Sequence, residues 1–244
     1  MSVWLCIPSK RPQAEAQACV DKWRAMGYSV AFHRDIGDDL VDCDYLSYGE
    51  YQGYAKTTNA LIKKVLAGDT ACQWVVTGGD DTDPDPNKRA EEIAEECERH
   101  FSPEVLPYWK AHSMSGTTFG VMQPTGDRFA QGSIDRIAGS PWIGREFCER
   151  VNGGKGPYAE DYAHMFVDEF LQGLATALGV FWQRPDLVHL HRHFMRKDES
   201  LNSVAVARPV PPHLVEANSP RHWDRSKALF QKHKASGFRE FFPV

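Results

Sequence analysis

The stretch WVVTGGDDTDPDP, from Trp74 to Pro86, joins an apolar run to a turn with four carboxylates in six residues. The run from Cys72 to Val76 predicts a short buried strand, bounded by Gly78 and Gly79, and residues 87–100 predict a helix after the turn. A strand followed by a turn and a helix is typical of open α/β sheets. Ligands of such sheets bind beyond the carboxyl ends of the strands, which is where the acidic turn lies.

The acidic turn, formed by Asp80, Asp81, Asp83 and Asp85, has two interpretations. Asp, Gly and Pro are ordinary turn residues, so Asp83 or Asp85 could simply cap the following helix. Carboxylates this close together also repel one another and raise each other's pKa, a cost that a cation among them relieves. The position of the turn after an inner strand favours a bound metal ion.

The elements before this stretch predict a largely parallel sheet. Residues 2–7 (SVWLCI) and 29–33 (SVAFH) have the composition of strands, and residues 12–27 between them predict a helix with one apolar face. Residues 53–67 predict a second helix, which leads to the strand before the acidic turn. Strands that alternate with helices in this way form βαβ units, so the fold class is α/β.

The second half of the chain predicts a mixed set of elements. We expect strand, turn and strand over 118–132, a loop over 137–144, helices over 145–151 and 160–178, strands over 179–182 and 186–191, and a helix over 221–235.

The helix expected over 160–178 carries two stripes. Apolar residues recur at every fourth position and predict the core face, namely Tyr162, Phe166, Phe170 and Leu174. Polar residues at i, i+3 and i+7 would share another face and one site, namely Asp161, His164 and Asp168.

A second polar cluster, HLHRH, places His189, His191 and His193 at alternate positions, so an extended chain would project all three to one side. The cluster has two interpretations: partly exposed polar side chains, or metal ligands. Two aspartates and one histidine would leave a divalent ion coordinatively open, and this donor set suits Mn²⁺. An open shell of that kind can accept a substrate phosphate.

Length and composition limit the class of protein. The 244 residues, 42% of them hydrophobic, are enough for one sizeable domain. The six cysteines show no CxxC spacing, which predicts free thiols, and no apolar run is long enough to span a bilayer. We therefore expect a cytoplasmic protein without membrane insertion. The net charge is -5, yet residues 185–244 hold 10 Lys and Arg against 6 Asp and Glu.

Taken in order, these motifs resemble the GT-A fold glycosyltransferases, most closely the family-2-like and bacteriophage-encoded members. The motifs are IPSKRP after the first strand, GYAKTTNALI, the DxD-like acidic turn, SPWIGREF, the DEF helix and VHLHRH, which together span residues 3–194. The resemblance implies a single GT-A (Rossmann-like) domain over residues 1–205 with a mostly parallel central sheet. A helical, basic C-terminal extension over 206–244 would pack on it. For a phage-encoded enzyme the location would be the host cytoplasm.

The resemblance also implies roles for particular residues. Those that would hold a nucleotide sugar, most readily a UDP-sugar, are Pro8, Ser9, Lys10 and Arg11. The DxD corresponds to Asp81 and Asp83, with Asp80 beside it to reach the ribose or the metal, which would be Mn²⁺ or Mg²⁺. The late histidine that completes the metal shell corresponds to His191, with His189 and His193 as rivals. Trp142 matches a position near the sugar and the acceptor.

The acid on the acceptor-side helix corresponds to Asp168 or Glu169, which are adjacent here. A metal ion bridging two phosphates would neutralise the leaving nucleoside diphosphate, with help from Lys10 and Arg11. An inverting enzyme also needs a carboxylate base for the acceptor hydroxyl, and we assign this role to Asp168.

The acceptor is open at this stage. The basic tail, interleaved with aromatic residues, could follow the phosphate backbone of DNA, or it could be a solvated helix beside a saccharide, lipid-linked or small-molecule acceptor. The metal motifs would also suit a nucleotidyltransferase or a phosphoester hydrolase, and a non-catalytic nucleotide-sugar-binding protein is the third class.

Overall fold

In the computed structural model of the protein, the described residues are 1–102, 118–127, 137–192, 196, 215–216 and 219–243. The first half of the chain forms β1 (Ser2–Pro8), α1 (Gln13–Ala25), β2 (Ser29–Arg34), β3 (Tyr45–Tyr48), α2 (Tyr54–Gly68) and β4 (Cys72–Val76). The second half forms β5 (Thr82–Asp83), α3 (Ala90–His100), β6 (Val121–Pro124), β7 (Trp142–Gly144), α5 (Arg145–Arg150), a 3-10 turn (Val151–Gly154), α6 (Val167–Ala177), β8 (Phe181–Arg184), β9 (Leu190–His191), α8 (Pro220–Ala235) and a second 3-10 turn (Arg239–Phe241).

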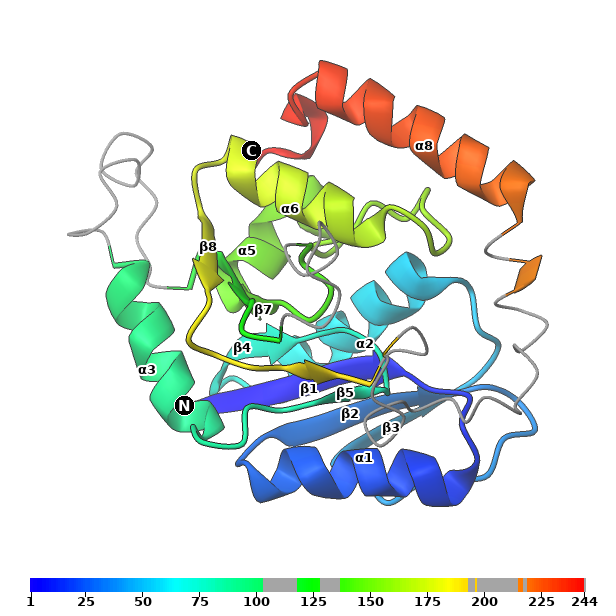
Figure 1. Ribbon diagram of the computed structural model, residues 1–244, viewed down its shortest axis with the longest axis vertical. Coiled ribbons are helices and arrows are strands. Elements are labelled where there is room, and N and C mark those ends of the chain that lie inside the picture. The colour runs from blue at the N-terminus through cyan, green and yellow to red at the C-terminus, as the bar shows by residue number, and fades with distance from the viewer. Residues whose placement is uncertain (103–117, 128–136, 193–195, 197–214, 217–218, 244) are drawn as a thin grey trace.

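The central sheet has seven strands in the order β3-β2-β1-β4-β7-β6-β8 (Figure 1). All neighbouring strands are parallel except β7, which is antiparallel to both β4 and β6. The expected α/β class with a mostly parallel sheet is therefore confirmed. The chain leaves β1 toward β2 on one side and later returns to β4 on the other, so the carboxyl ends of β1 and β4 flank a topological switch point.

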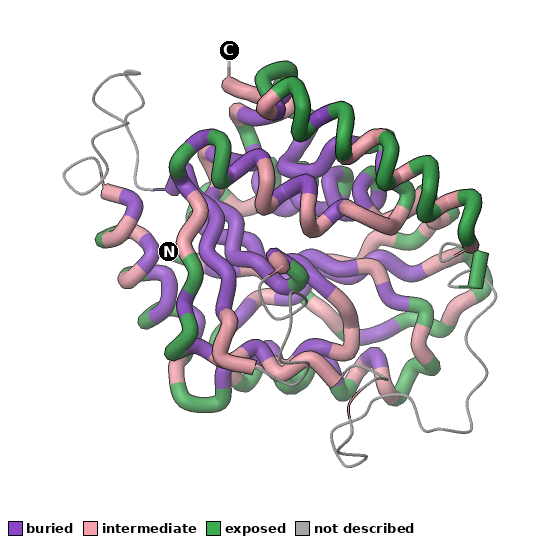
Figure 2. The backbone as a smooth tube through the Cα atoms, turned by 45° about the horizontal axis from the view of Figure 1, so that its top comes forward, coloured by how far each residue is buried: buried purple, intermediate pink, exposed green. Residues whose placement is uncertain are grey.

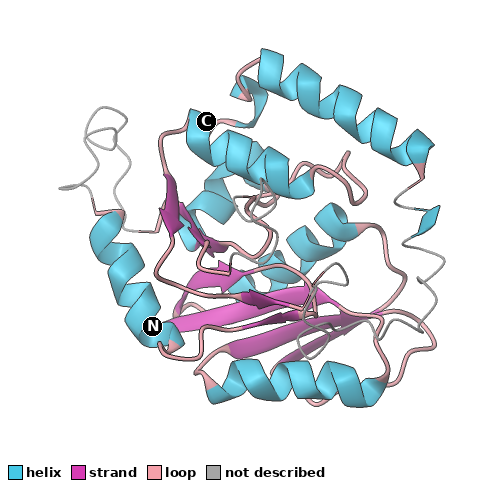
Figure 3. Cartoon of the chain, viewed as in Figure 1, coloured by secondary structure: helices cyan, strands magenta, loops and turns pink. Residues whose placement is uncertain are grey.

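Helices cover both faces of the parallel part of the sheet. Right-handed crossovers place α1, between β1 and β2, on one face and α2, between β3 and β4, on the opposite face (Figure 3). Strands that are covered on both sides must be apolar along their whole length. Ala31, Phe32 and Val75 are accordingly 0% exposed, and the inner strands form the buried centre of the molecule (Figure 2).

The helix expected over 160–178 begins only at Val167. Phe166 has a left-handed backbone conformation with φ 66, which an α-helix cannot include. The Phe166 ring packs against Trp223 and Phe230 of α8, with ring centroids 5.0 and 5.6 Å apart. This tertiary contact decides where the helix begins. The prediction that Asp161, His164 and Asp168 form one helical stripe was therefore wrong.

Other boundaries also differ from the sequence-based expectations. Residues 142–144, expected in a loop, form the antiparallel strand β7. Helix α3 begins at Ala90 rather than at residue 87, because a capped turn precedes it. The strand expected over 186–191 is reduced to β9, which pairs with β5 in a separate two-stranded sheet. The second strand expected within 118–132 lies outside the described residues, beyond residue 127.

The basic C-terminal helix, expected over 221–235, is confirmed as α8. It packs on α6 and on the loop before it, through the aromatic contacts of Phe166 and a 2.9 Å hydrogen bond between Tyr162 Oη and His233 Nδ1. The expected boundary between residues 205 and 206 lies outside the described residues. No helix in the described part of the chain is long and apolar enough to cross a membrane.

Candidate functional site

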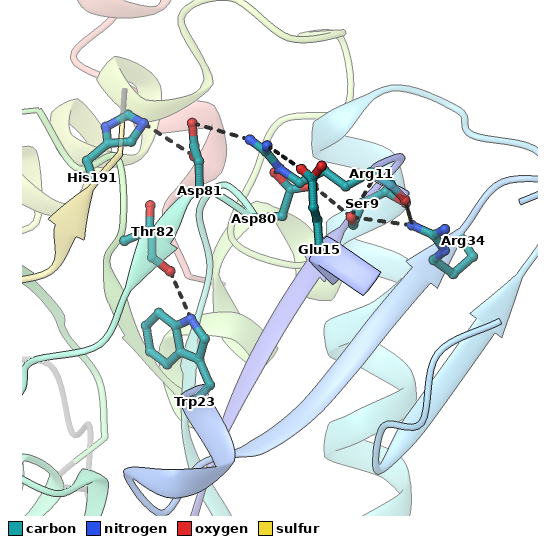
Figure 4. Close-up of polar contacts among 9 residues, drawn as sticks. All are labelled: Ser9, Arg11, Glu15, Trp23, Arg34, Asp80, Asp81, Thr82 and His191. Atoms are coloured by element: carbon teal, nitrogen blue, oxygen red, sulfur yellow. Dashed lines mark hydrogen bonds and ion pairs between the residues drawn. The ribbon is translucent and has the colours of Figure 1, made fainter. Parts of the chain in front are cut away.

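The turn after β1 is fixed by a buried arginine at the end of the neighbouring strand β2. Arg34 is 1% exposed, and its Nη1 donates hydrogen bonds to the carbonyl oxygens of Ser9 (3.0 Å) and Arg11 (2.9 Å). Its Nε donates to the carbonyl oxygen of Asp39. Because one rigid guanidinium group binds two carbonyls of the same turn, the turn has a defined path beside β4 (Figure 4).

Asp80 joins the turn after β1 to the turn after β4. One carboxylate oxygen accepts a 2.6 Å hydrogen bond from Ser9 Oγ, and the other accepts a 2.6 Å bond from Arg11 Nε. Burial raises the pKa of the Asp80 carboxyl, and the charge of Arg11 opposes that rise. These hydrogen bonds join Asp80 to Ser9 and Arg11, so this carboxylate organises the turn that the sequence assigned to the nucleotide.

Asp81, in the turn after β4, lies between His191 of β9 and Arg11 of the turn after β1 (Figure 4). Its Oδ1 lies 3.4 Å from His191 Nε2, and its Oδ2 lies 3.9 Å from Arg11 Nη2. Burial raises the pKa of Asp81, but His191 and Arg11 outweigh burial, so the pKa lies below its usual value. A Cβ atom on Gly79 would lie 2.4 Å from Asp81 Oδ1, so a larger residue at 79 would displace this carboxylate oxygen.

Asp83 has different partners from Asp81. Its carboxylate forms ion pairs with Lys22 of α1 (2.8 Å) and with Arg192 after β9 (2.6 Å). Within the described residues, no group of three or more His, Cys, Asp and Glu side chains is placed to hold a metal ion. The expected set of Asp81, Asp83 and His191 is therefore not assembled here, because two cations hold Asp83 against α1 and β9.

Asp85 has the structural role that the sequence left open for it. It is 2% exposed, and its Oδ1 accepts hydrogen bonds from the amides of Asn87 (2.8 Å) and Lys88 (3.0 Å). Its Oδ2 accepts from the amide of Val188 at 2.8 Å. Asp85 therefore closes the turn before α3 and ties it to the segment that leads to the histidines.

The histidines of HLHRH have different surroundings. His189 is 4% exposed, its Nδ1 lies 2.7 Å from Ser140 Oγ, and Trp142 Nε1 donates to its Nε2 at 3.5 Å. Burial lowers the pKa of His189 to about 4, so it is a neutral core residue. His191 is the histidine beside Asp81, with its side chain 38% exposed. His193 lies outside the described residues.

Asp168 lies in the first turn of α6, near Gly139. A Cβ atom on Gly139 would be 3.9 Å from Asp168 Oδ2. Burial, and next the neighbouring charge of Glu169, raise the pKa of Asp168 to about 7, while His191 opposes the rise. A carboxyl whose pKa is near 7 can exchange a proton at neutral pH, which is what an acid or base catalyst requires.

Asp168 and Glu169 have different neighbours. Asp168 is close enough to Tyr54 and His191 to affect the pKa of each, whereas Glu169 affects the pKa of Tyr162, whose hydroxyl bonds to α8. Asp168 is thus the carboxylate on the side of the acidic turn.

The remaining predicted residues lie as follows. Pro8 ends β1, and Lys10 is half-exposed and pairs with Asp35 at 3.1 Å. Trp142 is 0% exposed and donates to His189, so its side chain supports the histidine segment from the core.

The sequence assigned no role in this site to Arg34, which binds the turn after β1, or to Asp127 and Arg196, which bind the main chain of His191. A charged residue at the end of the apolar run 29–34 was an available signal for Arg34. Asp127 and Arg196 come from segments that only the fold brings together.

A cavity of about 240 Å³ lies elsewhere, between α2, α5 and residues 154–156. Its walls include Lys63, Lys155 and Glu149, and none of its lining residues belongs to the acidic turn. The candidate site is therefore defined by its converging polar side chains.

Comparison of the chain with protein-family models and with curated proteins gives no match. Its function therefore has to be argued from the fold and from the chemistry of this site.

Proposed function

We propose that the protein is a metal-dependent glycosyltransferase, which moves a sugar from a nucleotide-sugar donor to a hydroxyl acceptor. The observation that carries the proposal is the meeting of the turns after β1 and β4, where Ser9 and Arg11 bind Asp80 beside Asp81. The four strands β3-β2-β1-β4 have the order in which doubly wound sheets bind nucleotides at the switch point.

The turn after β1 would bind the diphosphate of the donor. Arg11 presents a guanidinium group, which can bind two phosphate oxygens at once. Lys10 is half-exposed next to it and can add a second positive charge. Ser9 and Asp80 hold Arg11 in this position, so part of the conformational cost of binding is met before the donor arrives.

Asp81 and His191 fit a divalent ion whose coordination shell is completed by phosphate oxygens of the substrate. One carboxylate and one imidazole suit Mn²⁺, and Mg²⁺ is commonly bound through one or two carboxylates, water and phosphate oxygens. When bound, the ion would neutralise negative charge on the leaving nucleoside diphosphate. Asp83 stays in its ion pairs with Lys22 and Arg192 in this proposal.

Asp168 would accept the proton of the acceptor hydroxyl in an inverting transfer. Its pKa of about 7 gives it appreciable basicity while leaving much of it deprotonated at neutral pH. Direct attack by the acceptor oxygen forms the new glycosidic bond as the bond to the diphosphate breaks, and the hydroxyl proton passes to an Asp168 oxygen.

The first prediction concerns the donor. A nucleoside diphosphate at 100 times its dissociation constant should stabilise the protein by about 2.7 kcal/mol when Mn²⁺ is present. For a chain of this size that corresponds to a rise of about 5–10 °C in Tm. Thermal melts with UDP, GDP and ADP, each with Mn²⁺ or with excess chelator, measure it. Equal stabilisation in chelator would contradict the metal bridge.

Product analysis separates the transferase from its alternatives. Slow reaction of a nucleotide sugar with water should release a nucleoside diphosphate and the free sugar. Release of pyrophosphate from a nucleoside triphosphate would instead identify a nucleotidyltransferase. Tight binding of nucleotide sugar without turnover over a broad acceptor panel would indicate a binding protein.

Helix α8 favours a polyanionic acceptor such as DNA. Its apolar side packs on α6, and its exposed residues include five cations against one carboxylate, namely Arg221, Arg225, Lys227, Lys232 and Lys234 against Asp224. Because Phe166, two residues before Asp168, contacts Trp223, this helix starts close to the proposed base. Trp223 is 43% exposed and offers a surface on which a base could stack.

The second prediction tests this acceptor class. Reversing two exposed charges, Arg225→Glu with Lys232→Glu, should weaken binding of a single-stranded oligonucleotide and make its salt dependence shallower by about 0.7 per lost phosphate contact. Fluorescence anisotropy at several salt concentrations measures both. The matched control is Lys63→Glu with Lys64→Glu on the exposed face of α2. Equal effects of the two double variants would mean that the oligonucleotide is attracted only by the general charge of the protein. That result would favour a saccharide or small-molecule acceptor.

A further inference from the structure

The strand that carries His191 is too short to fix this residue by pairing alone. In the described part of the chain, β9 has two residues and pairs only with β5, with Thr82 opposite His191. The neighbouring Arg192 amide donates to the Asp81 carbonyl at 2.7 Å, so alternate residues bond toward β5. The amide and carbonyl of His191 therefore point to the outer edge of β9.

Two charged side chains bind that outer edge. Asp127 Oδ2 accepts a 2.8 Å hydrogen bond from the His191 amide, and Arg196 Nε donates to the His191 carbonyl oxygen. Arg196 also forms an ion pair with Asp127. The two side chains take the place of a further strand, since they accept from one main-chain group of His191 and donate to the other.

Asp127 itself is placed by main-chain bonds between distant segments. The amides of Thr125 and Gly126 donate to the carbonyl oxygens of Arg184 and Leu187, both at 2.8 Å. A Cβ atom on Gly126 would lie 2.6 Å from the Leu187 oxygen, so only glycine allows this approach. The turn that bears Asp127 is thus attached to the segment that leads into β9.

The ion pair is more buried than simple surface charges would be, with the side chains of Arg196 and Asp127 exposed to 7% and 13%. A buried ion pair contributes little net stability, because desolvation offsets its attraction. Asp127 and Arg196 bind each other and also bind the amide and the carbonyl of His191, which indicates that the ion pair serves to place His191.

We propose that Asp127 and Arg196 are positioning residues, which hold the His191 main chain so that its imidazole stays within reach of Asp81. The inference rests on the proposed function, because it assigns His191 to the metal ion. Neither side chain needs to touch the ion or the donor. Outer partners of metal ligands commonly alter metal affinity by about 10- to 100-fold when they are replaced.

The test compares two buried arginines. Arg196→Gln should weaken Mn²⁺ binding about 10-fold or more, and Arg196→Lys should restore only part of it, because one ammonium group cannot bind both Asp127 and the carbonyl in the same geometry. The control is Arg184→Gln. Arg184, at the end of β8, has a side chain 9% exposed that pairs with Asp186 (2.6 Å) and with Glu96 of α3 (2.8 Å), and its loss should leave Mn²⁺ affinity unchanged. Titration calorimetry with Mn²⁺ alone measures the affinities.

A second measurement does not depend on the metal. Hydrogen exchange of the His191 amide should accelerate about 10-fold or more in Arg196→Gln and remain at the wild-type rate in Arg184→Gln. Unchanged exchange, or an unchanged Mn²⁺ affinity in a protein that binds Mn²⁺, overturns the positioning role. Faster exchange in Arg196→Gln, together with a wild-type protein that binds no Mn²⁺, would support the placement of His191 while refuting the proposed metal function.

Discussion

Replacing Asp168 by Asn is expected to lower turnover about 10²-fold or more while donor affinity stays nearly unchanged. A base acts in the transition state, so its loss affects kcat and not the binding of the donor. The measurement is kcat and KM for sugar transfer or for slow hydrolysis. Glu169→Gln is the matched control, because it removes the neighbouring carboxylate, which lies near Tyr162, and leaves the proposed base in place with a less raised pKa. Full turnover in Asp168→Asn would remove the inverting mechanism and favour a retaining enzyme.

The pH dependence of the same residue gives a second readout. A base must be deprotonated, so wild-type kcat should rise as the pH passes about 7 and level off above it. Stability has the opposite trend. The pKa of Asp168 is raised in the folded protein, so the folded state binds the proton more tightly, and stability is lost as the pH rises from about 4 to about 7.

Asp168→Asn should therefore increase stability at pH 8, by at most about 4 kcal/mol, and the increase should disappear near pH 4. Denaturant unfolding at several pH values measures it. A variant that is more stable and less active has lost a functional carboxylate. If the wild type and Asp168→Asn were equally stable at pH 4 and also at pH 8, Asp168 would not lie in an environment that resists its ionisation.

Replacing Asp81 by Asn is expected to abolish the metal-dependent stabilisation by a nucleoside diphosphate, with Mn²⁺ affinity reduced by about 100-fold or more. An amide offers the metal no negative charge, and the effect of losing a direct ligand exceeds that of losing an outer partner. Titration calorimetry and thermal melts measure it. The fold should be retained, because Asp81 is not part of the core.

The matched control for Asp81→Asn is Asp83→Asn. Asp83 is paired with Lys22 and Arg192, so Mn²⁺ affinity should stay within a few-fold of the wild type. Loss of metal binding in Asp83→Asn to the same degree would show that Asp83 leaves its ion pairs when the metal binds. That result would restore the ligand set expected from the DxD pattern.

The sequence alone determined most of the parallel half of the fold, although it did not predict the edge strand β3. Strands covered on both faces must be apolar throughout, and this makes β1, β2 and β4 visible as short runs between helices with one apolar face. The acidic turn could be placed at a carboxyl end for the same reason. Capping by Asp85 was available as an alternative because turn chemistry is local.

Only the tertiary structure decided which polar groups meet. The carboxylates at 81 and 83 have different partners, because cations from α1 and from the segment after β9 bind Asp83, whereas His191 and Arg11 lie beside Asp81. His189 and His191 have different environments, because His189 is hydrogen-bonded to Ser140 and Trp142 in the core and His191 faces Asp81. Helix α6 begins at Val167 because Phe166, whose ring packs against Trp223 of α8, has a left-handed backbone conformation. Such contacts join residues far apart in the chain, and no local pattern of the sequence encodes them.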